Sequence, residues 1–190
     1  MFNDQMIAFI GGGVMGEAMV RGLLGQNIVT PDQVMVADPW DERRESLAEQ
    51  YNIYTTVDNR EAAEKGQVVV LSIKPQSIPY VLPEIRGHLR RGDLLLSIIA
   101  GTPIRKLADG AAHASVFRAM PNTPAQIGLG ITVWTATEEV SEAHKEQAQA
   151  ILGSLGQEIF VEQESYLDMA TALSGSGPGY VFMMMEALID

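Results

Sequence analysis

The chain alternates short apolar runs with longer segments in which apolar and polar residues mix at helical spacing. The apolar runs are rich in Val and Ile and lack polar alternation, which is typical of strands buried on both faces of a sheet. We expect strands at residues 6–10, 34–37, 68–73, 94–99, 116–120, 130–135 and 158–161.

The segments between these runs suit helices. We expect helices at residues 14–24, 41–51, 59–64, 77–89, 104–110 and 138–152. Strands and helices that follow one another in this way form βαβ units and a mostly parallel sheet. The pattern therefore predicts an α/β fold with a mostly parallel sheet.

From about Gln163 the pattern changes, because no further strand is expected. Two helical stretches follow, at residues 163–173 and 179–190, with a break at Ser174-Gly175-Ser176-Gly177-Pro178-Gly179 between them. The second stretch, YVFMMMEALID, is apolar on nearly every side and needs partners all round. We expect residues 1–162 to form one domain and residues 163–190 to begin a helical domain that continues beyond Asp190.

Composition removes several classes of protein. The formal net charge of −11 argues against nucleic acid or an anionic membrane surface as a general partner. The absence of Cys excludes disulfides, thiolate metal sites and cysteine nucleophiles. The N-terminus resembles no signal peptide and no long apolar run is present, so we expect a soluble, cytoplasmic protein.

The sharpest motif is Gly11-Gly12-Gly13-Val14-Met15-Gly16, which fits G-x-G-x-x-G between the first expected strand and the first expected helix. In this place Gly11 permits a tight turn, Gly13 lets a diphosphate approach the backbone, and Gly16 lets the helix pack closely. The free amides at the helix start and the helix dipole favour an anion. The alternative is a turn with no ligand.

Asp38 ends the second expected strand, where an acid typically accepts hydrogen bonds from an adenosine ribose. By itself it favours NAD. Arg43 and Arg44 follow, and they suit either a 2′-phosphate or an exposed helix face. The choice between NADH and NADPH therefore stays open at this point.

Other strand ends also carry candidate residues. Lys74 follows a buried strand, and ligands of open α/β sheets bind beyond the carboxyl ends of strands. The small residues of 97–102 leave room for a flat ring, and Pro121-Asn122-Thr123-Pro124 forms a rigid loop after a further strand. The alternatives are a surface charge for Lys74 and a self-bonded turn for Asn122. His88, His113 and His144 lie in polar contexts, so we expect them to face solvent and predict no metal site.

Five segments in order, IAFIGGGVMGEAMVRGLL, VVVLSIKPQ, LSIIAGTPI, RAMPNTPAQIGLGIT and ALSGSGPGYVF, resemble pyrroline-5-carboxylate reductase over nearly the whole chain. RAMPNTP and SGSGPGY are more specific than the glycine turn. The resemblance implies a Rossmann domain followed by a helical domain that intertwines with a second subunit and completes the active site there. It implies a homodimer or higher homo-oligomer, with a small-molecule substrate and neither nucleic acid nor membrane as partner.

The resemblance also implies roles for particular residues. From the residues themselves we take Lys74 and Asn122 as the catalytic candidates, and we expect them to position nicotinamide or substrate without exchanging protons. Glu164 and Ser176 lie at substrate positions. The cofactor contacts fall on Ile10, Gly11, Gly12, Gly13, Val14, Met15, Gly16, Asp38, Asn59, Ser72, Ile73, Lys74, Pro75, Ile99 and Ala100.

The implied reaction is reduction of 1-pyrroline-5-carboxylate to L-proline by hydride from NADPH or NADH. A family segment that binds the substrate carboxylate has no counterpart here, so we expect these 190 residues alone to bind a dinucleotide weakly and to be inactive. Two alternatives remain: another Rossmann reductase or hydroxyacid dehydrogenase, and a non-catalytic dinucleotide-binding module.

Overall fold

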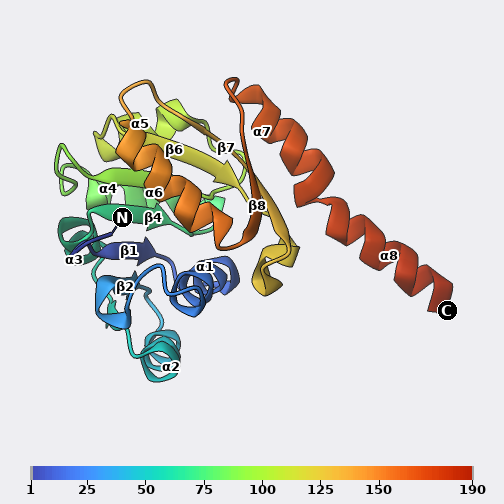
Figure 1. The fold of residues 1–190 in the computed structure, drawn as a ribbon, viewed down its shortest axis with the longest axis horizontal. Helices are drawn as coiled ribbons and strands as arrows, with labels where there is room; N and C mark the ends of the chain where they lie inside the picture. The colour runs from blue at the N-terminus through green and yellow to red at the C-terminus, as the bar shows by residue number, and fades with distance from the viewer. Residues whose placement is uncertain (1, 190) are drawn as a thin grey trace.

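The computed structural model describes residues 2–189, so Met1 and Asp190, the last residue of the expected second C-terminal helix, lie outside the described residues. One eight-stranded sheet in the order β3-β2-β1-β4-β5-β6-β7-β8 forms its centre (Figure 1). The strands are β1 (Ile7–Ile10), β2 (Val34–Ala37), β3 (Tyr54–Thr56), β4 (Val68–Leu71), β5 (Leu94–Ser97), β6 (Val116–Met120), β7 (Gly130–Ala136) and β8 (Gly156–Phe160).

Helices connect these strands. They are α1 (Val14–Gly25), α2 (Asp41–Tyr51), α3 (Asn59–Lys65), α4 (Ile78–Ile85), α5 (Ile104–Ala111), α6 (Glu142–Gly153), α7 (Ser165–Ala170) and α8 (Gly177–Ile189). Short 3₁₀ turns lie at Pro31–Gln33, Pro75–Ser77 and Thr123–Ile127.

Successive side chains of the central strands point to opposite faces of the sheet, and helices cover both faces. Ile7 and Phe9 of β1 pack with α1, α2 and α6, whereas Ala8 and Ile10 pack with α3, α4 and α5. This three-layer arrangement explains why the strands read as unbroken apolar runs.

The expected α/β, mostly parallel Rossmann-like fold is confirmed. Strands β1 to β6 pair in parallel, β7 runs antiparallel to β6, and β8 runs parallel to β7. The sequence pattern does not predict β3, whose three residues, YTT, are exposed or half-buried and carry no apolar run. Pairing with β2 forms this strand, through Met35↔Tyr54, Val36↔Thr55 and Ala37↔Thr56.

The expected break between the two C-terminal helices is wrong in form. Residues Thr171–Gly175 form a turn of π-helix that continues α7, and α8 begins two residues later. Ser174 Oγ donates to Ala170 O at 3.0 Å and Ser176 Oγ to Thr171 O at 2.9 Å, so hydroxyls take up carbonyls where the helix widens. The Ser/Gly-rich segment therefore bends the helix without ending it.

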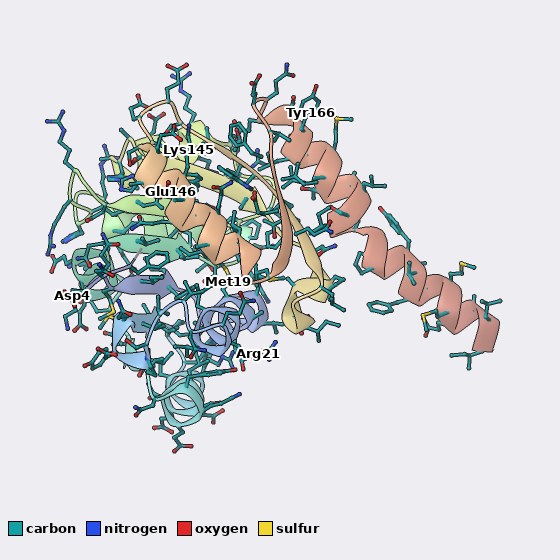
Figure 2. All side chains as sticks on the ribbon, viewed as in Figure 1. Asp4, Met19, Arg21, Lys145, Glu146 and Tyr166 are labelled. Carbon is teal, nitrogen blue, oxygen red and sulfur yellow. The ribbon has the colours of Figure 1, made fainter. Side chains whose placement is uncertain are left out.

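Helix α8 projects away from the sheet, and its side chains stand out with no other element over them (Figures 1 and 2). Its large apolar residues are all exposed, from Met185 at 53% to Ile189 at 84%. Among residues 2–189, no helix combines the length and the apolar character needed to cross a membrane.

Candidate active site

The candidate site lies at the carboxyl edge of the sheet, between β1 and β4. The chain order reverses there, since β1 pairs with β2 on one side and with β4 on the other. Ligands of open α/β sheets bind at such a switch point. The glycine turn, Asp38 and Ser72 follow β1, β2 and β4 at this edge.

The glycine turn is held tightly against β4. Gly11 has φ +101°, and a Cβ there would lie 2.7 Å from Ser72 O. A Cβ on Gly16 would lie 2.5 Å from Gly11 O, so these two positions require glycine for different reasons. Ser72 Oγ donates to Gly11 O at 2.7 Å and fixes the turn.

Gly13 differs from both, because a Cβ there would meet no atom of residues 2–189 within 4 Å. It is the N-cap of α1, with φ −66°, and no side chain caps the helix. The first intrahelical bond runs from Glu17 N to Gly13 O at 2.9 Å, so the amides of Val14, Met15 and Gly16 precede the helical ladder. This open, uncapped start fits a dinucleotide diphosphate.

Asp38 is buried beside the turn, at 8% exposure. Its Oδ2 accepts from Gly12 N at 2.8 Å and its Oδ1 from Trp40 N at 3.0 Å. An ionised carboxylate has about four acceptor sites, so two remain after these bonds. They are free to accept from the hydroxyls of a ribose.

Sequence reasoning missed a polar network behind the turn. Arg43 donates from Nε to Gly12 O and from Nη2 to Glu17, while Tyr51 Oη donates to Glu17 Oε1 at 2.8 Å. Burial alone would raise the pKa of Glu17, but the hydrogen bonds from Arg43 and Tyr51 and the charges of Arg43 and Arg21 outweigh it and lower the pKa. Burial, together with the bond to ionised Glu17, raises the pKa of Tyr51.

A cleft of about 430 Å³ opens over these groups. Its lining contains Gly11, Gly13, Asp38, Pro39, Trp40, Arg43, Ser72, Ile73, Lys74 and Ser77. A larger hollow of about 680 Å³ lies at the amino ends of β1 and β2, near Asp4 and Gln33, away from the strand ends that carry the candidate residues. We therefore place the site at the smaller cleft.

Lys74 is exposed in this cleft and, within residues 2–189, forms no ion pair or side-chain hydrogen bond. Its charge is available to a ligand. Ile10, Gly12, Val14, Met15, Gly16 and Pro75 flank the lining residues in the chain.

The structure does not bring every predicted cofactor residue into the cleft lining. Asn59 lies outside it and donates from Nδ2 to Glu84 Oε2 at 2.7 Å. Ile99 and Ala100 follow β5 and also lie outside the lining. Ile99 is buried, and its amide donates to Ser97 Oγ at 3.2 Å.

Asn122 follows β6 and is tied to the next strand. Its Oδ1 accepts from Ile131 N at 2.9 Å, at a sequence separation of nine residues. The bond is not the self-bonded turn that the sequence left open, and it fixes the loop between β6 and β7. Because Oδ1 is held by this hydrogen bond, the orientation of the whole Asn122 side-chain amide is fixed.

Glu164 is held by a buried arginine that sequence reasoning did not select. Arg118 of β6, 4% exposed, donates from Nη1 to Glu164 Oε1 at 2.7 Å and from Nη2 to Asp168 Oδ1 at 2.8 Å. Glu164 Oε1 also accepts from Ile104 N at 2.6 Å, at the start of α5. An Arg in the middle of an otherwise apolar strand, VFRAM, is the signal that could have found it, because a buried Arg needs an acidic partner.

The Ser176 region approaches the end of β6. A Cβ on Gly175 would lie 2.9 Å from Met120 Cε, so the π-helical turn passes close to the residue that precedes the Asn122 loop. Ser176 is half-buried beside this contact. The Asn122 loop and the Ser/Gly-rich segment are therefore neighbours through Met120.

The histidines correct one expectation. His113 is buried at 8%, where its Nε2 lies 2.8 Å from Asp93 O. His88 and His144 are half-buried, and His88 Nδ1 pairs with Glu64 at 2.7 Å. Solvent-facing is therefore wrong for His113, because the turn after α5 folds it against the loop before β5. Residues 2–189 contain no cluster of three potential metal ligands.

Two families match this chain. Residues 6–101 match the family described as NADP oxidoreductase, coenzyme F420-dependent, and residues 164–190 match pyrroline-5-carboxylate reductase dimerisation. Pyrroline-5-carboxylate reductase of Synechocystis sp. is 38% identical over 184 residues, which cover 97% of this chain and 68% of that protein.

Two solved structures are similar over nearly the whole chain. A pyrroline-5-carboxylate reductase from Coxiella burnetii has a TM-score of 0.90 and 35% identity, covering 97% of this chain and 68% of that one. Pyrroline carboxylate reductase of Plasmodium falciparum, with NADP bound, has a TM-score of 0.87 and 29% identity, covering 100% of this chain and 70% of that one.

Proposed function

The chain belongs to the pyrroline-5-carboxylate reductase family, and from this premise we propose how its residues serve the reduction of 1-pyrroline-5-carboxylate to L-proline by NADH or NADPH. The observation that carries the assignment is 38% identity along 97% of the chain, over a fold whose glycine turn leaves an open helix start.

When bound, a reduced dinucleotide would supply the hydride that the C=N carbon of the cyclic imine accepts, and the ring nitrogen would take a proton, so that one hydride and one proton would convert imine to amine. Asp38, Arg43 and Lys74 are the ionisable residues in the cleft lining. The site therefore suits a reaction in which the protein mainly aligns two reactants, which lowers a barrier by about 7–11 kcal/mol.

Each part of the site has a proposed task. The uncapped amides of Val14, Met15 and Gly16 bind the diphosphate, and the two free acceptor positions of Asp38 bind ribose hydroxyls. The ammonium group of Lys74, exposed in the cleft, orients nicotinamide or the substrate carboxylate. Of the remaining proposed cofactor contacts, Ile73 lines the cleft, and Ile10, Gly12 and Pro75 flank its lining in the chain. Asn59, Ile99 and Ala100 lie outside the lining, and we keep them as proposed contacts.

The substrate side is built from later segments. The hydrogen bond from Ile131 N to Asn122 Oδ1 fixes the orientation of the Asn122 side chain, and we propose that this side chain positions the substrate. Arg118 and Ile104 N hold Glu164 in one orientation, and Ser176 lies on the turn that packs near Met120. We assign Glu164 and Ser176 to the substrate end of the site.

We propose a domain boundary at residues 162 and 163 and a homodimer formed through the C-terminal helices. Support comes from the exposed apolar surface of α8 and from the dimerisation family match at 164–190. A second subunit then covers α8 and completes the active site. We place the protein in the cytoplasm, as the sequence leads us to expect, and cell fractionation checks this.

An assay with defined products tests the function. Full-length protein is given 1-pyrroline-5-carboxylate with NADH or NADPH, and proline is measured by mass spectrometry alongside the loss of reduced nicotinamide. We expect equal amounts of proline formed and reduced nicotinamide consumed. In a separate assay with NAD⁺ or NADP⁺, we expect no oxidation of 3-hydroxy acids. Turnover of a 3-hydroxy acid but not of the imine would assign the protein to a hydroxyacid dehydrogenase. Binding without turnover of either would favour a non-catalytic module. Light scattering at the protein concentration of the assay measures the molar mass and so checks the dimer.

A further inference from the structure

The two arginines nearest the adenosine end of the cleft are each paired with an acid. Arg43 binds Glu17 through Nη2, and Arg44 binds Asp41 through Nη2. Both also bind backbone carbonyls: Arg43 Nε donates to Gly12 O, and Arg44 Nη1 donates to Asp38 O at 2.8 Å. A 2′-phosphate is usually accommodated by an arginine at this place, and here both arginines are already bound.

Glu17 is the group that holds Arg43 in place. It reaches from α1 across to α2, where Tyr51 Oη donates to its second oxygen at 2.8 Å. The Arg43 and Glu17 side chains are only 28% and 20% exposed, so water competes weakly for their bond. With Nε on Gly12 O and Nη2 on Glu17, the guanidinium is fixed at two points against the glycine turn.

Asp38 adds the opposite charge at the ribose position. Both of its oxygens are fixed by backbone amides, those of Gly12 and Trp40, so the carboxylate is anchored beside the cleft. Its remaining acceptor positions suit hydroxyl donors and repel a phosphate. The adjoining hollow is lined by Asp41, Glu42 and Arg43, and Asp41 is paired with Arg44, so this hollow offers a 2′-phosphate no arginine that is not already bound to an acid.

We propose that Asp38 and Glu17 together make this site select NADH over NADPH. Asp38 binds the free 2′-hydroxyl, and Glu17 is a specificity-determining residue that withholds Arg43 from a 2′-phosphate. The inference rests on the proposed function, and its new element is the role of Glu17, which lies behind the turn and does not line the cleft.

The test compares both dinucleotides by turnover and by binding. In full-length protein, kcat/KM with 1-pyrroline-5-carboxylate is measured for NADH and NADPH, and Kd is measured by calorimetry for NAD⁺ and NADP⁺. We expect the wild type to favour the form without the 2′-phosphate by about tenfold or more in both measurements.

Glu17→Gln tests the role of the acid behind the turn. It removes the charge that holds Arg43 and keeps a side chain of similar size, so we expect the preference to fall at least about threefold, through tighter NADP⁺ binding. Asp38→Ser should lower it further through weaker NAD⁺ binding. Glu49→Gln, at an exposed position on α2, the helix that carries Arg43, is the matched control for net charge and should leave the preference unchanged.

The outcomes separate the two claims. A wild type that favours NADPH and NADP⁺ overturns the selectivity. An unchanged preference in Glu17→Gln, with native circular dichroism, overturns the role of Glu17 even if Asp38→Ser fails to fold. Failure to reduce the imine with either nicotinamide contradicts the proposed function alone, because the calorimetric comparison still decides selectivity.

Discussion

Arg118 on β6 and Glu164 before α7 form an ion pair at 2.7 Å, and this pair joins the sheet to the C-terminal helical segment. Arg118 also binds Asp168 at 2.8 Å, and Glu164 binds the backbone amide of Ile104. One buried guanidinium thus anchors α7 to β6, while Glu164 links α7 to the start of α5. The proposed substrate end of the site depends on this anchor.

Removing the carboxylates of this ion pair should lower the free energy of unfolding by more than removing the arginine. The Arg118 side chain is 4% exposed, whereas those of Glu164 and Asp168 are 32% and 68% exposed. Removing both carboxylates (Glu164→Met with Asp168→Ala) leaves a buried charge and should lower the free energy of unfolding by about 3–5 kcal/mol. Arg118→Met leaves carboxylates that water can reach and should cost about 1–2 kcal/mol.

Urea unfolding measures both changes. Arg105→Met is the matched control, because the Arg105–Asp109 pair is exposed at 91% and 75% and should contribute less than about 0.5 kcal/mol. If Arg118→Met proved the more costly variant, lost packing of its side chain would outweigh burial of the unpaired charge.

Two glycines of the same turn should separate binding from stability. Ala at position 13 meets no atom, so Gly13→Ala should change the free energy of unfolding by less than about 0.5 kcal/mol. The new methyl group faces the cleft and should weaken dinucleotide binding about tenfold or more. Gly16→Ala places Cβ 2.5 Å from Gly11 O and should cost about 1–3 kcal/mol. Calorimetric titration and urea unfolding give the two readouts, and unchanged dinucleotide affinity in Gly13→Ala would argue against diphosphate binding there.

Lys74 should contribute to binding or turnover without contributing to the fold. It is exposed in the cleft and, within residues 2–189, has no side-chain partner. Loss of a hydrogen bond from a charged group costs about 1.5–3 kcal/mol, so Lys74→Met should lower kcat/KM by about 10- to 100-fold. The pH profile should keep its shape, because Lys74 positions and does not exchange protons. Lys145→Met, which loses only a surface pair with Glu142, is the control. Wild-type kinetics in Lys74→Met would remove Lys74 from the site.

Glu17 should give the protein a specific acid sensitivity. Its folded pKa lies below the ordinary value, so its contribution to stability is present above the unfolded pKa and is lost as pH falls through the folded pKa. Glu17→Gln should cost about 0.5–1 kcal/mol at neutral pH, and the difference from wild type should shrink below about pH 4.3. Denaturant unfolding over a pH series measures this, with Glu49→Gln as the control. A difference that stays constant with pH would contradict the ionised pair.

Strands buried on both faces are predictable because burial itself dictates their sequence. The run of β4, VVVL, can belong only to the interior, and the glycine turn beside β1 is fixed by local geometry. β3 escapes such reasoning because its exposed or half-buried residues become a strand through pairing with β2. The local sequence pattern also predicts a break at the π-helical turn where the helix continues. There, the hydroxyls of Ser174 and Ser176 donate hydrogen bonds to backbone carbonyls of the widened turn.

Candidate residues after strands could be predicted because parallel strands end at one edge of a sheet. The polar partners of the site residues could not be predicted, because they lie far away in the chain. Glu17 and Tyr51 lie 34 positions apart in the chain, and Arg118 and Glu164 lie 46 apart. Only the packing of α1 on α2, and of α7 on β6, makes these groups neighbours.

The central claim is that the open start of α1 receives the diphosphate of a nicotinamide dinucleotide. A crystal structure of the full-length protein with saturating NAD⁺ tests it most directly. We expect the diphosphate to lie against the backbone amides of Val14 and Met15, with the ribose hydroxyls bound to Asp38. A dinucleotide bound elsewhere, or a niche at Gly13 that stays empty at saturation, would contradict it.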